Sequence, residues 1–360
     1  MQLVILSGGM GTRLGLTDIP KPMVKIGDKS ILEHQINLAR KYGIKDIIII
    51  SGHLSGVIID YFGDGKDFGV NITHITEPYP LGTAGCLKLI KNIIDERFLI
   101  FYGDLFLDFD IESFIESDRT SEAIATVIVQ PNDYPYDSDL LEINDKKEVT
   151  AFHPKPRDKN EYRKNLVNAA VYILSRDILN HIKENEAQDF GKDIFPALLK
   201  EKIKIKAYKT SEYLKDLGTP DRFEEVKQDF IFGKISSCNK KNKRKAVFFE
   251  LDEYLENLFA DYPHINDQKA INDIQEFVKK INKSNYLSIM IRKSASSYIE
   301  NNLQEKIETI FGQKNAYIDE TFYLDANFIH EIEKTVQQMN IDVANSFLST
   351  NNKCETLILL

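Results

Sequence analysis

A glycine-rich stretch near the start of the chain is the first candidate for chemistry. The stretch "LSGGMGTRLG" (6–15) places four glycines and one arginine within ten residues, directly after an apolar start. Glycines leave backbone N–H groups free to bind an anion, because no Cβ stands in the way. The guanidinium of Arg13 is planar and suits phosphate oxygens. The pattern predicts a phosphate-binding turn, with a purely structural turn as the alternative.

A second cation follows shortly afterwards. Lys21 lies in "PKPM" (20–23), where two prolines stiffen the loop that carries it. The glycine stretch is not a Walker A loop, because no GK[ST] closes it, and it lacks the GxGxxG fingerprint of dinucleotide-binding folds. Two cations beside a glycine turn favour a polyphosphate ligand, although a solvated lysine in a turn is the plain alternative for Lys21.

Composition excludes several classes of protein. The 360 residues suggest two domains, and a net charge of −9 argues against a protein that coats nucleic acid through a broad cationic face. The three cysteines, Cys86, Cys238 and Cys354, form no CxxC pair, which argues against a disulfide framework or a zinc site. The first residues do not show a basic stretch followed by a long apolar run, and no apolar run approaches the roughly 18 residues of a membrane helix. We therefore expect a cytoplasmic protein without membrane insertion.

Short apolar runs alternate with helical periodicity in the first two thirds of the chain. The runs are rich in β-branched and aromatic residues, which is typical of buried strands. They are Leu3–Leu6, Ile47–Ile50 and Phe98–Tyr102. Between the first two, residues 30–39 have helical spacing, with Ser30 as N-cap and Glu33 completing a capping box. This alternation predicts a doubly wound, Rossmann-like α/β sheet with mostly parallel strands.

A polar run divides the chain into two parts. The run "SSCNKKNKRK" (236–245) contains five cations and predicts a linker between a domain of residues 1–235 and a domain of residues 246–360. After it, "AVFFELDEYL" begins a new apolar strand, and helical periodicity resumes at 269–281. The second part is therefore expected to be a smaller α/β domain.

Five motifs, in order, resemble the nucleoside-diphosphate-sugar pyrophosphorylases, which are sugar-1-phosphate nucleotidyltransferases. They are "LSGGMGTRLG…PKPM", "EPYPLGTAG", "FYGDLFLD", "NAAVYIL" and "YLKDLGTP". The wording of "HPKP", "DFGKDIFP" and "KDLGTPDRFEEV" is most similar to enzymes that make GDP-D-glycero-D-manno-heptose. Mannose-1-phosphate guanylyltransferases share much of this wording, so mannose 1-phosphate or another hexose 1-phosphate stays open as the substrate.

The resemblance implies attack by a sugar 1-phosphate oxygen on the α-phosphorus of a nucleoside triphosphate, with release of pyrophosphate. Positioning and charge neutralisation then dominate catalysis, since no protein nucleophile is required. Arg13 and Lys21 would stabilise charge on the α-phosphoryl group and the departing pyrophosphate. The implied nucleotide contacts are Leu6, Gly8, Gly9, Gly11, Thr12, Gly82, Thr83 and Gly85.

The remaining implied roles concern the metal and the sugar phosphate. Asp104 and Asp216 would hold Mg²⁺ together with substrate phosphates, although an aspartate after a strand often caps a helix or forms a turn. The implied sugar-phosphate contacts are Lys155, Asn168 and Glu77. Pro154 replaces the glutamate that commonly precedes the family's sugar-phosphate lysine, which puts one hydroxyl contact in doubt. Asn168 and Glu77 have an ordinary alternative as turn or strand-end residues.

The second domain resembles the haloacid-dehalogenase-type (HAD-like) phosphatases, in which an apolar strand precedes DxD. Glu250 stands where the nucleophilic aspartate belongs, while Asp252 keeps the acid/base position. The extra methylene displaces the attacking oxygen, an error that costs about 100-fold. We therefore expect a HAD-like domain without phosphatase activity, kept for folding, oligomerisation or regulation; a residual glutamate-dependent phosphatase is the alternative.

A function without turnover is the competing hypothesis for the whole chain. The protein would then bind a sugar nucleotide as a regulator, but a sensor does not need to keep the two cations and both metal carboxylates. The sequence leaves open whether the chain forms a homo-oligomer.

Overall fold

The computed structural model describes most of the chain and divides it into two compact units. It describes residues 1–9, 18–158, 161, 163–250, 268–284, 286–292, 298–323, 328–342, 346–350 and 353–356. Unit 1 comprises residues 1–129, 141–154 and 168–235, and unit 2 comprises residues 130–140, 155–167 and 236–360. In the described residues, no helix combines the length and the apolar character that crossing a bilayer requires.

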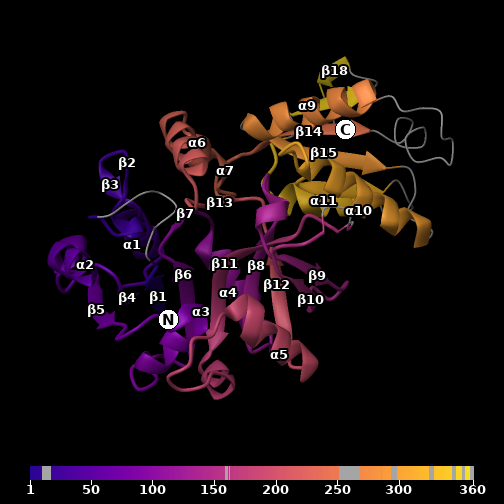
Figure 1. Cartoon of the computed structure of the whole chain (residues 1–360). Coiled ribbons are helices and arrows are strands. Elements are labelled where there is room, and N and C mark those ends of the chain that lie inside the picture. Colours follow the sequence, from indigo (N-terminus) through magenta and orange to yellow (C-terminus); the bar gives the residue numbers. More distant parts are fainter. Residues whose placement is uncertain are drawn as a thin grey trace. The chain divides into compact units, whose positions relative to one another are not determined.

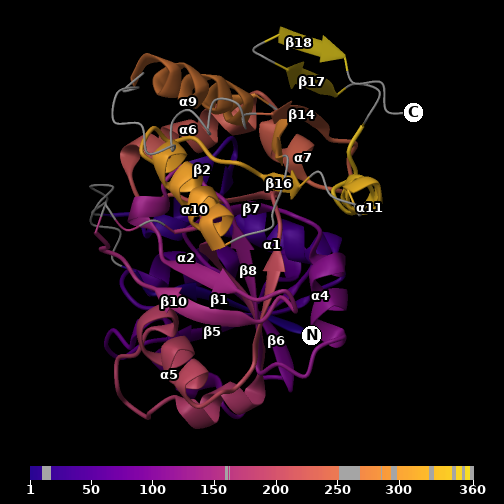
Figure 2. The same ribbon diagram turned by 90° about the vertical axis from the view of Figure 1, so that its right-hand side faces the viewer.

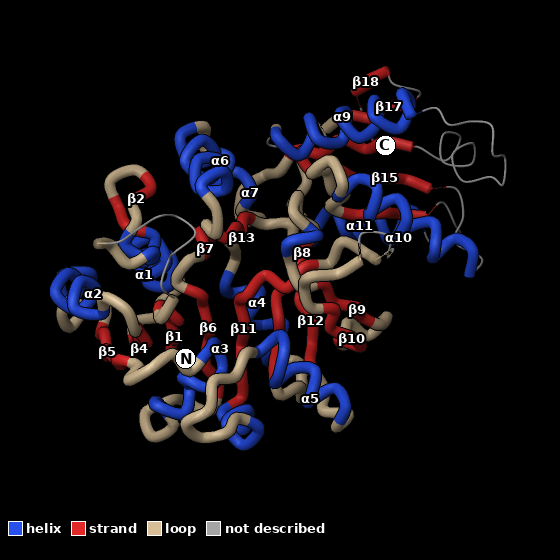
Figure 3. The backbone as a smooth tube through the Cα atoms, viewed as in Figure 1, coloured by secondary structure: helices blue, strands red, loops and turns tan. Residues whose placement is uncertain are grey.

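Unit 1 is built on a mixed sheet, one half of which is parallel (Figure 1, Figure 3). The strands of the parallel half are β1 (Gln2–Ser7), β4 (Asp46–Ser51), β5 (Asn71–Thr76) and β6 (Arg97–Tyr102). They pair in parallel in the order β6-β1-β4-β5. The predicted doubly wound α/β fold class is confirmed, and each of the three apolar runs forms one of these strands.

The other strands of unit 1 extend this sheet on the β6 side. They are β8 (Ala125–Gln130), β9 (Leu140–Ile143), β10 (Val149–His153), β11 (Val167–Ser175) and β12 (Ile205–Lys209). Strand β11 is antiparallel to β6, whereas β12 is parallel to β8. The sheet is therefore mixed, with its parallel half formed by the first four long strands.

Helices of unit 1 cover the sheet because alternate strand residues point to opposite faces. One core joins Leu3 and Ile5 of β1 to α1 (Ile31–Lys41), α2 (Ser55–Phe62) and α4 (Ile111–Arg119). Ser30 caps α1 as predicted, since its Oγ accepts the backbone N–H of Glu33 at 3.1 Å. The Glu33 carboxylate accepts a hydrogen bond from the Tyr61 hydroxyl. The remaining α-helices of unit 1 are α3 (Gly82–Gly85), α5 (Phe195–Lys200) and α6 (Pro220–Ile231), and α7 (Lys234–Cys238) begins in unit 1 and ends in unit 2.

Two small ladders complete unit 1. Strand β7 (Leu105–Asp108) pairs antiparallel with β13 (Tyr213–Asp216), and β2 (Lys25–Ile26) pairs with β3 (Lys29–Ser30). Short 3-10 or π segments lie at Lys21–Met23, Lys66–Phe68, Cys86–Ile90, Pro135–Asp137, Arg176–His181 and Phe190–Ile194. The β7–β13 ladder brings together two segments that lie more than 100 residues apart in the chain.

Unit 2 contains a second, smaller sheet in the order β16-β15-β14-β17-β18. Figure 2 shows β17 and β18 side by side at one edge of this sheet. Its strands are β14 (Lys245–Glu250), β15 (Tyr286–Arg292), β16 (Glu320–Tyr323), β17 (Phe347–Thr350) and β18 (Lys353–Thr356). Its helices are α9 (Gln268–Lys283), α10 (Tyr298–Gly312) and α11 (Phe328–Gln338). The periodicity at 269–281 correctly predicts α9, and the run expected to be a linker ends at the first residue of β14.

The sheet of unit 2 has apolar cores on both faces. Phe249 of β14 packs in one core with Val278 of α9 and Phe311 of α10, whereas Phe248 packs in another with Ile332 of α11. Two further segments cluster with this unit, 130–140 and 155–167, which we call the loop pair. The sequence analysis placed both segments in the first domain.

Candidate functional site

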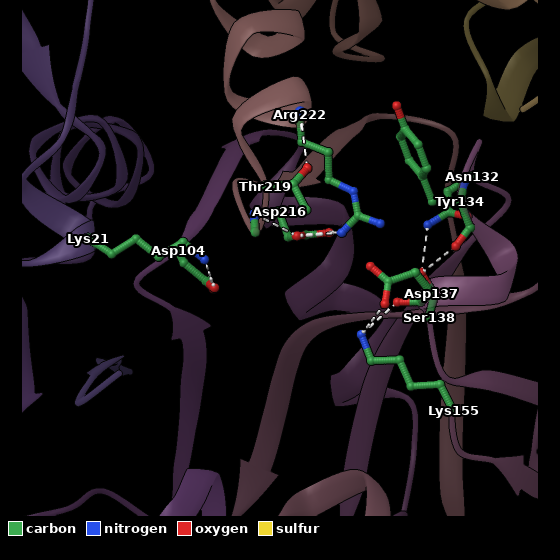
Figure 4. A network of polar contacts seen from close by, with 11 residues as sticks. Lys21, Asp104, Asn132, Tyr134, Asp137, Ser138, Lys155, Asp216, Thr219 and Arg222 are labelled. Atoms are coloured by element: carbon green, nitrogen blue, oxygen red, sulfur yellow. Dashed lines mark hydrogen bonds and ion pairs between the residues drawn. The ribbon is translucent and has the colours of Figure 1, made fainter. Parts of the chain in front are cut away.

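Lys21 and Asp104 form an ion pair at one end of the parallel sheet of unit 1 (Figure 4). Lys21 begins a single 3-10 turn after Pro20, and Asp104 follows β6 by two residues. The Lys21 Nζ donates to Asp104 Oδ2 at 2.6 Å, with 12% of the lysine side chain exposed. The stiff proline turn thus holds the predicted catalytic lysine on the first predicted metal carboxylate.

The β7–β13 ladder places Asp216 next to Asp104. Asp216 is the partner of Leu105 across the ladder, and the N–H of Leu217 donates to the carbonyl of Asp104 at 3.0 Å. Backbone hydrogen bonds of a ladder fix the two chains in register. The two predicted metal residues, distant in sequence, are therefore neighbours at one end of this ladder, since Asp104 immediately precedes β7 and Asp216 ends β13.

Arg222 fixes the carboxylate of Asp216, and the sequence analysis did not identify this residue (Figure 4). Its Nη1 lies 2.8 Å from both Asp216 oxygens, and the arginine side chain is 5% exposed. The N–H of Gly218 donates to Asp216 Oδ1 at 2.9 Å. Thr219 caps α6 by accepting the N–H of Arg222. The sequence feature that could have identified Arg222 is the helix cap at Thr219, because this cap places the arginine in the first turn of α6.

The residues present fit a divalent cation that shares its coordination with a substrate. Among the residues that the structure describes, no group of three or more His, Cys, Asp or Glu side chains is arranged to hold a metal. Mg²⁺, however, is commonly held by one or two carboxylates together with phosphate oxygens and waters. Asp104 and Asp216 supply two such carboxylates, each balanced by a basic side chain.

The first glycine turn lies against Glu77. A Cβ added to Gly8 would stand 2.0 Å from Glu77 Oε2, so a larger residue there would displace the Glu77 carboxylate. Glu77 Oε1 accepts the N–H of Leu81 at 3.1 Å. Burial raises the pKa of the Glu77 carboxyl, partly offset by this hydrogen bond. The carboxylate thus borders the predicted nucleotide turn, although the resemblance gave it a role with the sugar.

The other predicted residues of this turn fall into two groups. Some lie in β1 or just after it, and the rest lie outside the described residues. Leu6 lies in β1, and its carbonyl accepts the N–H of Gly103 at 2.8 Å. Gly9 follows β1 and has open space where a Cβ would stand. The predicted Gly11, Thr12 and Arg13 lie outside the described residues.

The second glycine turn packs closely against a later segment of unit 1. Gly82 has φ +72°, and an added Cβ would lie 2.5 Å from the carbonyl oxygen of Gln188. At Gly85 an added Cβ would lie 2.4 Å from the carbonyl oxygen of Glu186. The Thr83 hydroxyl donates to Asp189 at 2.8 Å. These contacts give the three predicted nucleotide residues a packing role, and Asp189 is a further residue that the sequence analysis did not identify.

Asn168 lies in β11 and is half-buried. Its Nδ2 donates to the Tyr172 hydroxyl at 2.9 Å, and its Oδ1 accepts the N–H of Ala170 at 3.2 Å. Ala170 has φ +56°, an uncommon conformation for a residue with a side chain. The amide therefore stabilises a bend within the strand, and its predicted contact with a sugar remains a prediction.

Lys155 lies in the loop pair of unit 2 (Figure 4). Its Nζ donates to the carbonyl oxygen of Asp137 at 2.6 Å and to the carboxylate of the same residue at 3.1 Å. Its backbone N–H donates to Asp139 at 3.0 Å. The predicted sugar-phosphate lysine is thus held by the other segment of the loop pair.

The similarity of this chain to known proteins lies mainly in unit 1. Residues 2–231 match the family model described as nucleotidyl transferase. A D-glycero-alpha-D-manno-heptose 1-phosphate guanylyltransferase of Campylobacter jejuni is 32% identical over 229 residues, 62% of this chain and 97% of that protein. A UTP--glucose-1-phosphate uridylyltransferase of Synechocystis sp. is 29% identical over 63% of each chain. A mannose-1-phosphate guanylyltransferase of Mycobacterium tuberculosis is 28% identical over 64% of each chain. The matched region therefore covers less than two thirds of the length of the uridylyltransferase and of the mannose-1-phosphate guanylyltransferase.

Solved structures also match nearly two thirds of this chain. HddC from Yersinia pseudotuberculosis is 28% identical with a TM-score of 0.56, and the match covers 64% of this chain and 99% of that one. The same protein is known in complex with GMP-PN, with a TM-score of 0.55 to this chain. A putative glucose-1-phosphate thymidylyltransferase from Bacillus anthracis is 24% identical with a TM-score of 0.57, which supports the fold alone.

Proposed function

Because this chain belongs to the nucleotidyl transferase family, we propose that it transfers a nucleoside monophosphate from a nucleoside triphosphate to a sugar 1-phosphate. The observation that carries the proposal is the set of Lys21, Asp104 and Asp216 at one end of the sheet of unit 1. Ligands of open α/β sheets bind outside the carboxyl ends of the strands. A cation beside two carboxylates supports a reaction between two phosphates and a divalent metal.

The proposed reaction is a displacement at phosphorus. A phosphate oxygen of the sugar 1-phosphate forms a bond to the α-phosphorus, and the bond from that phosphorus to the bridging oxygen of the β-phosphate breaks. Pyrophosphate leaves with the electron pair of the broken bond. The Lys21 ammonium would stabilise the negative charge that develops on the phosphoryl and leaving-group oxygens. In this scheme it exchanges its contact with Asp104 for one with substrate.

We propose Mg²⁺ as the cofactor, held by Asp104 and Asp216. When bound, it would screen the two polyanions from each other and withdraw charge from phosphate oxygens. Arg222 holds both oxygens of Asp216, and Gly218 donates its N–H to one of them, so the carboxylate keeps its orientation before any ligand binds. A preoriented ligand lowers the entropy that metal binding has to overcome.

We propose GTP as the nucleotide. Guanylyltransferases are among the relatives, and the guanylyltransferase from Campylobacter is matched over nearly its whole length. Glu77 supplies a carboxylate, which only accepts hydrogen bonds while it is ionised, at the edge of the first glycine turn. Guanine is the base whose pairing edge offers two adjacent donors, N1–H and N2–H, to such a group. Uracil and thymine offer only N3–H.

We propose D-glycero-D-manno-heptose 1-phosphate as the sugar substrate, with mannose 1-phosphate or another hexose 1-phosphate as the second candidate. The first is favoured by the relative with the highest identity of those given above and by the motif wording of 153–156 and 189–196. Lys155 would neutralise the sugar phosphate, and Asn168 would contact a sugar hydroxyl.

The test is pyrophosphate release by the purified full chain with Mg²⁺. GTP, UTP, CTP, dTTP and ATP are each combined with heptose 1-phosphate, mannose 1-phosphate and glucose 1-phosphate. The proposal expects release with GTP and the heptose phosphate, and a Lys21→Met variant with at least about 100-fold lower kcat. Release only with a different pair would correct the substrate. Nucleotide binding without release from any pair would favour the alternative role as a sugar-nucleotide-binding regulator.

We also propose that residues 246–360 form a HAD-like domain without phosphatase activity. Glu250 ends β14, the central strand of the smaller sheet, where the phosphatase pattern requires aspartate. The predicted acid/base residue Asp252 lies outside the described residues. The expected result is no phosphate release from a sugar bisphosphate above that of a Glu250→Ala variant; release that depends on Glu250 would contradict it.

A further inference from the structure

The two segments of the loop pair are hydrogen-bonded to each other. Asn165 Nδ2 donates to the carbonyl oxygen of Asn132 at 2.7 Å, and the N–H of Asn132 donates to Asn165 Oδ1 at 3.2 Å. The Arg157 guanidinium donates to the carbonyl oxygen of Ser138 at 2.6 Å. Together with the contacts of Lys155 given above, these bonds tie the two segments to each other.

Helix α10 contacts both segments through Thr309 and Glu308. The Thr309 hydroxyl accepts the N–H of Arg163 at 3.2 Å and donates to the carbonyl oxygen of the same residue at 3.3 Å. The Thr309 carbonyl accepts the Tyr136 hydroxyl at 3.1 Å. Glu308 Oε2 accepts the N–H of Asn165 at 2.5 Å. The helix therefore satisfies backbone groups of the 155–167 segment and a side chain of the 130–140 segment.

The end of α10 lies close against the same body. An added Cβ at Gly312 would stand 2.5 Å from the Pro135 ring, so only glycine allows this approach. On another side of the helix, Ile307 and Phe311 are 1% and 3% exposed and pack in the core of the smaller sheet. Residues four apart share a face of a helix, and Thr309, two residues from each of these, lies on the opposite side, with Glu308 and Gly312 between the two sides. Helix α10 thus connects the loop pair to the core of the smaller sheet.

We propose that α10 is a positioning element for the sugar 1-phosphate, with Thr309 as its central positioning residue. By holding the loop pair, the helix limits where the Lys155 ammonium can stand when it meets the sugar phosphate. This inference rests on the proposed function, because Lys155 acts there on the sugar phosphate. It gives residues 298–312 a role in the transfer reaction that requires no phosphatase chemistry.

The test uses the full chain and compares Thr309→Val, which removes the hydroxyl at nearly constant size, with Thr309→Ser, which keeps it. Thr335→Val in α11 is the matched control, since it makes the same change in another helix of unit 2. For Thr309→Val we expect the KM for the sugar 1-phosphate to rise about fivefold, the loss that one or two hydrogen bonds produce. The KM for the nucleotide, the Ser variant and the control should stay within about twofold of wild type.

Hydrogen exchange provides a readout that does not depend on turnover. The N–H of Arg163 is bonded to the Thr309 hydroxyl, so its exchange should accelerate in Thr309→Val, whereas amides in β11 should exchange as in wild type. If Thr309→Val does not fold, Tyr136→Phe removes one donor to the Thr309 carbonyl, and the same KM should rise about twofold to threefold.

The outcomes separate this inference from the proposed function. An active protein in which Thr309→Val leaves the KM for the sugar 1-phosphate unchanged would overturn the role of α10 and leave the transfer reaction intact. An equal rise in the KM values for both substrates would also overturn it, because it would indicate a general structural effect. A wild-type protein that releases no pyrophosphate from any pair would overturn the proposed function, and this inference with it.

Discussion

The two lysines expected to act on phosphates, Lys21 and Lys155, are held in opposite ways. Lys21 is paired with Asp104, whose carbonyl belongs to the backbone ladder that also carries Asp216. Lys155 lies in loops that are held by hydrogen bonds between side chains and backbone groups. One of these bonds joins Arg163 to Thr309, which lie 146 residues apart in the sequence. The first arrangement depends on secondary structure within unit 1, while the second depends on a helix that comes much later in the chain.

This difference predicts how substitutions will act. Changes around Lys21 and Asp104 should lower the rate of the chemical step, because these groups meet charge that develops in the transition state. Changes around the loop pair should weaken binding of one substrate, because they displace a group that is otherwise intact.

The largest effect is expected for Lys21→Met. The variant removes the cation and leaves Asp104 without this partner, so kcat should fall about 100-fold to 1,000-fold with KM values changed by less than about threefold. Steady-state kinetics of pyrophosphate release measures both quantities. Lys25→Met, an exposed lysine of β2, is the matched control and should keep wild-type rates. A loss confined to KM would mean that Lys21 only binds substrate.

A smaller effect is expected for Arg222→Met. Without the guanidinium, Asp216 loses the partner that binds both of its oxygens, so we expect an approximately tenfold lower kcat and a higher Mg²⁺ concentration for half-maximal rate. A Mg²⁺ titration at saturating substrates measures this shift. The control is Arg119→Met at an exposed position of α4. An unchanged Mg²⁺ requirement would argue against Asp216 as a metal ligand.

A still smaller effect is expected for Gly312→Ala, at the other side of the comparison. The added Cβ would force Pro135 to move, and we expect the KM for the sugar 1-phosphate to rise about threefold while kcat stays near wild type. The control is Gly233→Ala, where an added Cβ meets open space but φ is +71°, so any effect there reflects backbone strain alone. A fall in kcat without a change in KM would contradict the proposal that Lys21 acts on the chemical step and Lys155 on substrate binding.

The smallest effect concerns Glu77 and pH. Burial raises the pKa of this carboxyl in the fold, so ionising it costs stability above its unfolded pKa, and the cost disappears as pH falls below that value. Glu77→Gln removes the ionisation. Its Tm should therefore exceed that of wild type slightly at pH 8 and equal it at pH 4, as measured by calorimetry. A Tm difference that is the same at both pH values would show that ionisation is not the cause.

The sequence predicted what depends on local pattern. The α/β fold class, three strands of the parallel half of the sheet and the Ser30 cap follow from periodicity and capping chemistry, which involve neighbours in the chain. The family resemblance is confirmed by the match over residues 2–231. The motifs also pointed to Asp104 and Asp216, which the β7–β13 ladder brings together. Their role as metal ligands remains a prediction.

Contacts between distant segments were not predictable in the same way. The bond from Thr83 to Asp189 and the hold of α10 on the loop pair join side chains to groups more than 100 residues away. Such bonds leave no periodic pattern in the sequence, because a single polar residue that makes a distant contact cannot be distinguished there from one that faces solvent. The sequence likewise left open whether Glu77 serves the sugar or the turn; its carboxylate borders Gly8 in the structure, and its contact with a sugar remains a prediction.

The most direct measurement is pyrophosphate release by wild type and Asp104→Asn as a function of Mg²⁺ concentration, with GTP and D-glycero-D-manno-heptose 1-phosphate. The account predicts Mg²⁺-dependent release by wild type and a rate at least about 100-fold lower for the variant at every Mg²⁺ concentration, because the carboxylate that pairs with Lys21 and holds the metal is lost. Release by Asp104→Asn at the wild-type rate and with the wild-type Mg²⁺ dependence would contradict the assignment of the site.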